Sequence, residues 1–219
     1  MYPEAFSIPV YVDYAAVFAW ALSGALVGMR KGFDLTGVFV VSLLSSVGGS
    51  LARDALFLQR KPPVLTDPNY LPVIMAATLL AALVGRWLIK DRYRVPFDRM
   101  IMMIDSFGTP AFAVLGMQLA ISMHVPVPGV LLVGVANGVG GSLLRDIVVR
   151  DVPAILKPGQ HFVTVLVLAC AFFMALVYYD IGHPATDGLI MIVLFVAIRA
   201  ITISFDLRTK PLLGNVKAP

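Results

Sequence analysis

Seven mostly apolar stretches of about 20 residues constrain this chain more than any other feature of its sequence. A helix needs about 20 such residues to cross the hydrocarbon core of a bilayer, and it bonds its own backbone polar groups there. Charged residues make up 14% of the chain, well below the roughly 25% of a soluble domain. The sequence therefore predicts an all-α integral membrane protein with seven transmembrane helices, in a single domain over residues 1–219. The predicted spans are approximately 12–29, 35–57, 70–89, 100–123, 127–149, 162–180 and 187–206.

A string of eight positions, VGGSLxRD, occurs twice in the chain. Its copies cover residues 47–54 and 139–146, so they lie 92 residues apart. The same offset pairs Asp13 with Asp105, and the register holds without a gap between these aspartates and the strings. A match over this length indicates an internal repeat.

The repeat copies, at about 12–89 and 100–180, each contain three predicted spans. Three is an odd number, so the second copy must enter the bilayer upside down relative to the first. Inverted repeats are typical of transport proteins, whose path lies at the repeat interface and is lined by discontinuous helices. The span at about 187–206 has no counterpart, and we expect it to pack outside the repeat pair or at a subunit contact.

The basic residues of the short loops predict the orientation, because Lys and Arg accumulate on the cytoplasmic side. The loop after span 2 carries Arg60 and Lys61, and the loops after spans 4 and 6 carry no Lys or Arg. The other loops and the tail are strongly basic, so we expect them on the cytoplasmic side. The predicted protein therefore spans the cell (inner) membrane with its N-terminus outside and its C-terminus in the cytoplasm. Their basic residues are Arg30, Lys31, Lys90, Arg92, Arg94, Arg99, Arg150, Lys157, Arg208, Lys210 and Lys217.

Paired glycines lie inside the second and fifth spans, and a serine follows each pair. Each glycine weakens a helix by about 1 kcal/mol, and such pairs are common at kinks. A serine can cap a helix that resumes after a break, so we expect two kinked, broken helices whose freed carbonyls face a cation path. Alternatively, the glycines only let helices pack closely and the nearby polar residues bond between helices. The candidate kink and pore residues are Gly48, Gly49, Ser50, Gly140, Gly141, Ser142, Ser45, Ser46 and Asn137.

An arginine and an aspartate follow each glycine pair within the same span. Charges at membrane depth are costly and usually face a cavity or a partner. Neighbouring helical residues point in different directions, so we do not expect Arg53 to pair with Asp54. The topology instead brings the aspartate at the start of one span and the arginine at the end of the next span to the same face of the membrane, so we expect these two to pair. The alternative is that both arginine side chains extend to the lipid headgroups. The predicted ion pairs are Asp13–Arg53 and Asp105–Arg145, and the predicted gating cluster also includes Asp54 and Asp146.

No pattern in the sequence indicates an enzyme, a cofactor site or a metal site. The chain lacks a nucleophile elbow and a P-loop, and its single cysteine, Cys170, lies in an apolar run. The histidines His124, His161 and His183 are scattered. The net charge of +4 is small and is not gathered in a basic arm, which argues against a nucleic-acid partner.

The repeated VGGSLxRD string, the plan of two three-span repeats plus one span, and the length of 219 residues resemble the prokaryotic branch of the trimeric intracellular cation (TRIC) channel family. Bacterial members of this family include putative glycine transporters. The resemblance covers all seven spans and implies a homotrimer with one pore in each protomer, which conducts potassium and also sodium. It implies kinks of the second and fifth helices at the glycine pairs. Animal members bind a phosphoinositide near these kinks; here Arg53 and Arg145 are candidates to hold another anionic membrane lipid or to gate the pore.

Two functions from different classes fit these features, and both remain open from the sequence. A passive cation channel agrees with the resemblance and with the backbone carbonyls that we expect to be freed at the glycine pairs. Arginines near a cation path repel cations, so the aspartates must neutralise them, and a salt bridge that closes the pore would satisfy this requirement. A secondary carrier of a small zwitterion such as glycine agrees with an arginine and an aspartate in one site, and the inverted repeat suits alternating access equally well. A non-transporting membrane scaffold is disfavoured, because it does not explain charges repeated at membrane depth.

Overall fold

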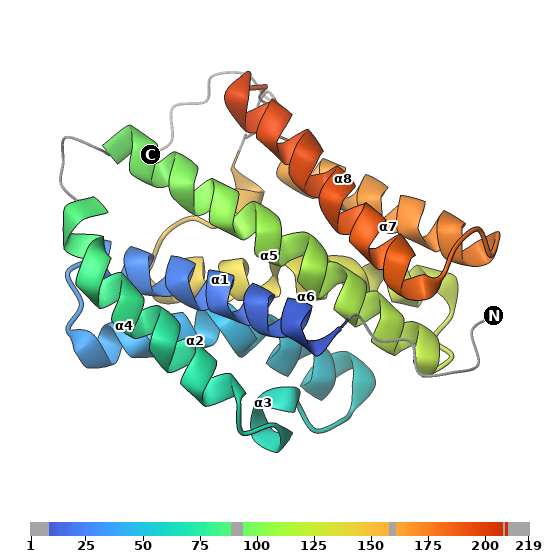
Figure 1. Ribbon diagram of the computed structural model, residues 1–219, viewed down its shortest axis with the longest axis horizontal. Coiled ribbons are helices and arrows are strands. Elements are labelled where there is room, and N and C mark those ends of the chain that lie inside the picture. Colours follow the sequence, from blue (N-terminus) through green and yellow to red (C-terminus); the bar gives the residue numbers. More distant parts are fainter. Residues whose placement is uncertain (1–8, 89–93, 158–160, 208, 210–219) are drawn as a thin grey trace.

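The computed structural model describes residues 9–88, 94–157, 161–207 and 209, and every regular element in them is a helix (Figure 1). Five of these helices are long and apolar enough to cross a membrane, judged by length and composition. Two further apolar helices, over Tyr70–Gly85 and Phe162–Tyr178, are shorter. The chain is therefore an all-helical, multi-pass membrane protein. The helices are α1 (Val10–Arg30), α2 (Leu35–Ala52), α3 (Pro63–Thr66), α4 (Tyr70–Leu88), α5 (Arg94–Ser122), α6 (Val127–Val148), α7 (Phe162–Tyr178) and α8 (Pro184–Ser204).

The seven predicted spans correspond to α1, α2 and the helices α4 to α8, with ends that differ by a few residues. The π-helical segment η1 (Arg53–Leu58) continues α2, and the 3₁₀ turn η3 (Ala154–Leu156) follows α6. The largest difference is at α5, which begins six residues before the predicted start near residue 100. Several basic residues used to predict the orientation lie outside the described residues; these are Lys90, Arg92, Arg208, Lys210 and Lys217.

Local sequence signals set several of the helix ends. Asp34 caps α2, because its Oδ1 accepts a hydrogen bond from the Gly37 backbone N–H at 2.8 Å. Proline occupies the first turn of α3, α6 and α8, where a missing backbone N–H breaks no helical bond. After α1 the chain turns at Gly32, whose φ of 78° is a left-handed conformation that suits glycine.

Two pairs of equivalent helices from the two repeats lie side by side and run in opposite directions. Helices α1 and α5 pack against each other (Figure 1), and an ion pair between Arg30 and Asp98 joins the end of α1 to the start of α5. Helices α2 and α6, the other central pair, also pack together. The second repeat is therefore inverted relative to the first, as the odd number of spans predicts.

Helices α2 and α6 approach so closely at their glycine pairs that no side chain fits between them. A Cβ atom on Gly140 would lie 2.7 Å from the Cα of Gly49, and one on Gly49 would lie 2.9 Å from the carbonyl oxygen of Asn137. A Cβ on Gly141 would meet the carbonyl oxygen of Ser45. Residues 45 and 137, like residues 49 and 141, are equivalent in the repeat, so a pseudo-twofold axis passes through this crossing.

The α-helix continues through both glycine pairs, so the prediction of broken helices with freed carbonyls was wrong. Residues 48–50 and 140–142 are α-helical. Ser50 and Ser142 do not cap a resumed helix; each Oγ donates to the carbonyl oxygen three residues earlier, at 2.8 and 3.0 Å. A freed carbonyl has no water to bond within a bilayer, and close packing of α2 against α6 offsets the low helix propensity of glycine.

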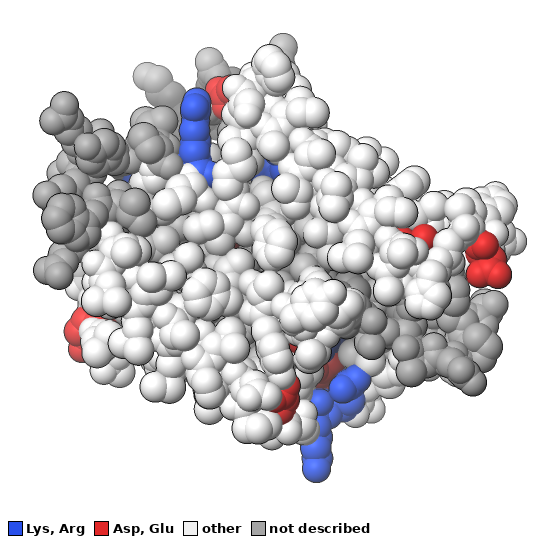
Figure 2. Space-filling model, in the orientation of Figure 1, with Lys and Arg blue, Asp and Glu red and all other residues white. Residues whose placement is uncertain are grey.

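The helices α4, α7 and α8 pack around the central group, which consists of α1, α2, α5 and α6. Helix α4 packs on α1 and α2, whereas α8 packs on α5 and α7 and so covers the second repeat. Figure 2 shows one face of the molecule, which is largely uncharged in its middle and carries Lys, Arg and Asp side chains toward its edges. This distribution suits a surface that contacts lipid at its centre and headgroups or water at its ends.

We predict that Gly140→Ala destabilises the protein by about 1–3 kcal/mol, because its new Cβ meets backbone that cannot move aside. The matched control is Gly129→Ala on the same helix, where the nearest atom is a methyl group of Val125 that can rotate away. Unfolding in mixed micelles with increasing dodecyl sulfate measures the free energy of both variants. Equal stability of the two variants would contradict the close backbone contact.

Candidate functional site

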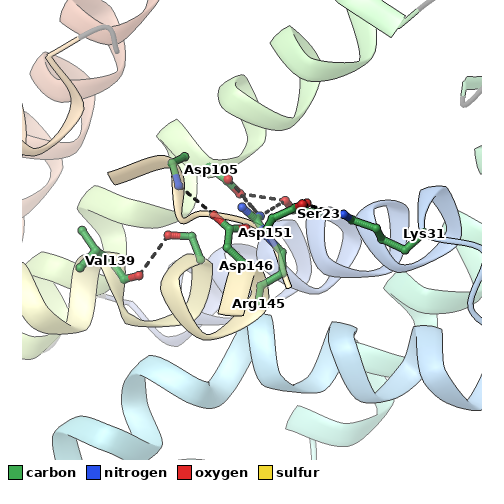
Figure 3. Close-up of polar contacts among 9 residues, drawn as sticks. Ser23, Lys31, Asp105, Val139, Arg145, Asp146 and Asp151 are labelled. Carbon is green, nitrogen blue, oxygen red and sulfur yellow. Dashed lines mark hydrogen bonds and ion pairs between the residues drawn. The ribbon is translucent and has the colours of Figure 1, made fainter. Parts of the chain in front are cut away.

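A buried group that we name the Arg145 cluster consists of Ser23, Asp105, Arg145 and Asp146 (Figure 3). Arg145 Nη1 lies 3.0 Å from both carboxylate oxygens of Asp105, and its Nε lies 2.9 Å from Asp146 Oδ1. Ser23 Oγ accepts a hydrogen bond from Arg145 at 2.7 Å and donates one to Asp105 at 2.8 Å. The predicted Asp105–Arg145 ion pair is therefore confirmed.

Three helices hold the Arg145 cluster away from solvent. Ser23 comes from α1, Asp105 from α5, and the other two residues from the end of α6. Arg145 is only 3% exposed, so the alternative that its side chain extends to headgroups was wrong. Asp146 also accepts a hydrogen bond from the Ala154 backbone N–H at 3.0 Å, which ties the chain after α6 to the cluster. One guanidinium thus binds two buried carboxylates and a hydroxyl.

The equivalent group in the first repeat, which we name the Arg53 cluster, is bonded differently. Arg53 Nε and Nη2 donate to the two carboxylate oxygens of Asp54 at 2.8 and 2.7 Å. The expectation that these neighbours do not pair was wrong, because the long arginine side chain folds back beside the aspartate. Asp13 accepts a hydrogen bond from the Tyr70 hydroxyl, and Arg60 Nε lies 4.0 Å from Asp54 Oδ1. These five residues form the Arg53 cluster.

The predicted Asp13–Arg53 pair was wrong as a direct contact, because within the described residues no ion pair joins these side chains. Tyr70 begins α4 and supplies the donor that satisfies Asp13. Arg53 is 5% exposed, so it does not extend to headgroups either. Arg53 is the first residue of the π-helical segment η1, whereas Arg145 lies in a regular α-helix. The wider π-helical turn therefore gives the Arg53 side chain different surroundings from those of Arg145.

The connection between α3 and α4 is tied to the start of α1 by a half-buried aspartate, Asp67. Asp67 accepts hydrogen bonds from the Tyr14 hydroxyl and, at 2.9 Å, from the Asn69 backbone N–H. These bonds, that from Tyr14 foremost, lower the pKa of Asp67 below its ordinary value because they favour the ionised carboxylate. This contact therefore weakens as the pH falls through the lowered pKa and the carboxylate gains a proton.

Each cluster lines a cavity at its own end of the helix bundle. The Arg145 cavity has a volume of about 870 Å³ and is lined by Ser142, Asp105, Arg145 and Asp146 among others. The Arg53 cavity has a volume of about 180 Å³ and is lined by Ser50, Asp13 and Arg53 among others. The three residues named for the Arg53 cavity are the repeat equivalents of three of those named for the Arg145 cavity. Because the two repeats are inverted, the two cavities enter the bundle from opposite ends. The other charged and titratable residues of the larger cavity are Arg30, Lys31, Asp98, Asp151, Lys157, His161 and Arg199.

The other candidate pore residues lie between these cavities and line neither of them. Ser45 and Asn137 are 0% exposed, and Ser46 Oγ donates to the Ser42 carbonyl oxygen at 2.9 Å within its own helix. Asn137 Nδ2 donates to the carbonyl oxygen of Phe112 at 2.5 Å. The four glycines form the helix crossing itself. The structure thus brings the repeated motif together as a septum between two polar cavities.

Three functional candidates carry weak signals in the sequence. Ser23 bridges Asp105 and Arg145, but its repeat equivalent is Leu115, so comparison of the copies does not reveal it. Tyr70 begins a span and its contact with Asp13 depends on tertiary packing. Arg199 on α8 lies in the unrepeated helix; it is 2% exposed and its guanidinium lies 4.9 Å from the ring centre of Phe162.

We predict that Arg145→Met destabilises the protein by about 3–5 kcal/mol, because it leaves two buried carboxylates without their cation. Lys31→Met is the matched control, since Lys31 pairs with Asp151 at 2.6 Å where the side chains are 34% and 45% exposed. Such an exposed pair contributes about 0.2–1 kcal/mol. Unfolding free energies in mixed micelles measure both, and similar losses would show that the Arg145 cluster is solvated.

The sequence comparisons agree with the repeat seen in the structure. A family model described as "Glycine transporter" matches twice, over residues 10–86 and 102–178. The two matches are offset by 92 residues, the offset of the repeated string. A UPF0126 membrane protein of Deinococcus radiodurans is 34% identical over 84% of this chain and 84% of its own length. The UPF0126 inner membrane protein YadS of Escherichia coli strain K12 is 27% identical over 90% of this chain and 93% of its own length.

Solved structures of similar fold are TRIC channels. A chain from the structures described as "Structural basis for conductance through TRIC cation channels" superposes with a TM-score of 0.81 at 23% identity, over 97% of this chain and all of the other. The TRIC trimeric intracellular cation channel orthologue from Rhodobacter sphaeroides gives a TM-score of 0.76 at 24% identity, over 90% of this chain and 97% of the other. The protein has the TRIC fold, and it belongs to the bacterial membrane family whose model is described as "Glycine transporter".

Proposed function

We propose that the protein is a homotrimeric channel for monovalent cations, chiefly potassium and also sodium, with one path in each protomer. The observation that carries this proposal is the pair of cavities, each lined in part by an arginine and an aspartate, which enter from opposite ends and meet the two sides of the α2–α6 crossing. Inverted repeats place a transport path at their interface, where these cavities lie. The shared fold supports the same conclusion, because the similar solved structures are cation channels.

In this proposal seven helices cross the bacterial inner membrane, with the shorter α4 and α7 among them. The N-terminus faces outside and the C-terminus faces the cytoplasm. Arg30, Lys31 and Lys157 line the larger cavity, and this excess of basic residues supports its placement on the cytoplasmic side. The smaller Arg53 cavity then opens to the outside.

The described conformation corresponds to a closed channel in this proposal. Arg145 places a positive charge in the larger cavity, where it would repel a cation, but it is held by Asp105 and Asp146. Opening requires α2 and α6 to bend apart at their glycine pairs, where low helix propensity makes bending inexpensive. Voltage or an anionic membrane lipid that competes for the arginines would shift this equilibrium.

The test is single-channel recording of the purified protein in a planar bilayer, with potassium chloride on both sides. We predict discrete current steps, and we predict that Arg145→Ala or Arg53→Ala raises the conductance or shifts the gating. Lys31→Ala, at the rim of the larger cavity, is the control and leaves the gating near wild type. Unchanged currents in both arginine variants would contradict the gating role, and a silent bilayer with verified insertion would contradict the channel.

A secondary carrier of a small zwitterion such as glycine is the second candidate. The observation that favours it is the septum of buried residues between the two cavities, since alternating access requires a site closed on at least one side. An arginine and aspartates in one cavity offer partners for a carboxylate and an ammonium group. Saturable uptake of labelled glycine into liposomes, without current steps, would select the carrier.

A further inference from the structure

The indole of Trp20 occupies the layer between the two cavities. Trp20 lies on α1, is 0% exposed, and stacks on Phe112 with ring centres 4.6 Å apart. Phe112 lines the Arg53 cavity. On its other side the indole lies against Gly141, whose next residue, Ser142, lines the Arg145 cavity. The two stacked rings therefore fill the space that a solute must cross to pass from one cavity to the other.

Two glycines of the second repeat make the slot that holds this indole. A Cβ atom on Gly108 would meet Trp20 Nε1, and a Cβ on Gly141 would meet the six-membered part of the ring. Trp20 and Phe112 are 92 residues apart, so they are repeat equivalents that stack at the pseudo-twofold axis. We call the two stacked rings of Trp20 and Phe112 the plug. The rings occupy equivalent positions about the axis, but only the indole of Trp20 carries a polar N–H.

Four polar atoms around the plug have no hydrogen-bond partner within the part of the chain that the structure describes. They are Trp20 Nε1, Ser45 Oγ, Thr109 Oγ1 and Asn137 Oδ1, and all four residues are 0% exposed.

The surroundings of the neighbouring glycines place these groups beside the stacked rings. Gly141 contacts both the indole and the backbone of Ser45, Gly108 precedes Thr109 and contacts Nε1, and Asn137 bonds the carbonyl of Phe112. Buried polar groups are nearly always bonded, so four exceptions in one layer call for a physical reason. Water that enters this layer would supply partners to all four atoms, and a cation would bind the three oxygens. The closed septum therefore contains the polar atoms that a hydrated path would need.

We propose that the Trp20 indole is the gate between the two cavities, and that the side-chain oxygens of Ser45, Thr109 and Asn137 contact a partly dehydrated monovalent cation when the indole moves. This inference rests on the proposed channel function and names the gate and the ion contacts of that path. An apolar constriction keeps water out while it is narrow and conducts once it is wide enough to wet. Displacement of the indole widens the septum and exposes the three oxygens together.

Single-channel recording of Trp20→Ala and Trp20→Phe tests the gate. We expect Trp20→Ala to raise the open probability several-fold, or to add a constant leak, and Trp20→Phe to give an intermediate effect. Phe173→Ala is the control, because Phe173 is equally buried but lies on α7 outside the septum. Wild-type currents in both Trp20 variants would overturn the gate. A silent wild-type protein would instead overturn the channel proposal.

A cysteine accessibility experiment gives a second readout that does not depend on current. The chain has one cysteine, Cys170, so Cys170→Ala provides a background without thiols. Ser45→Cys and Asn137→Cys are then treated in liposomes with a charged methanethiosulfonate reagent. We expect modification to be several-fold faster when Trp20 is also replaced by Ala or Phe. Equal rates with and without the indole would overturn the inference, even if the protein conducts.

Discussion

The direct backbone contact between α2 and α6 is the interaction on which the rest of the structure depends. Gly49 and Gly140 bring the two helices together without an intervening side chain, and this contact defines the pseudo-twofold axis. Every other paired feature follows from it: the stacked rings of Trp20 and Phe112, the two cavities and the two charged clusters take their places around the axis. Close packing of small residues is a main source of helix association in membranes, where apolar burial gives little advantage.

The two repeats carry the same aspartates and arginine at equivalent positions of their clusters but pair them differently. In the second repeat, Arg145 binds Asp105, which lies within the preceding helix α5, and Ser23 of the other repeat completes the network. In the first repeat, the equivalent arginine, Arg53, binds its neighbour Asp54, and the hydroxyl of Tyr70 is the partner of Asp13. Buried charges need partners, but nothing requires the same partners in both halves. The asymmetry makes the two ends of the bundle different, with a large, charge-rich cavity at one and a small cavity at the other.

Much of the fold was predictable from hydropathy and from the repeat. The spans agree with the observed helices because a bilayer requires continuous apolar helices of nearly fixed length. The inversion followed from counting three spans per copy. The repeated string also drew attention to the glycine pairs, which lie at the α2–α6 crossing, and to the arginine–aspartate pairs, which are buried; their role in a transport path stays a prediction. The Asp105–Arg145 contact was also predicted from topology, because the end of one span and the beginning of the preceding one lie toward the same face; α5 extends further than expected, so that Asp105 lies within the helix.

The sequence by itself determined the membrane class, the approximate positions of the helices and the inverted repeat, because these depend on local hydropathy, capping signals and the parity of the spans. Tertiary structure alone decided that the helices continue through Gly48-Gly49 and Gly140-Gly141, that Asp13 bonds Tyr70, and that the Trp20 indole stacks on Phe112. These outcomes depend on which atoms meet across helices distant in the sequence. Pairing of a buried charge is a competition among all neighbours, and neither residue type nor spacing specifies the winner.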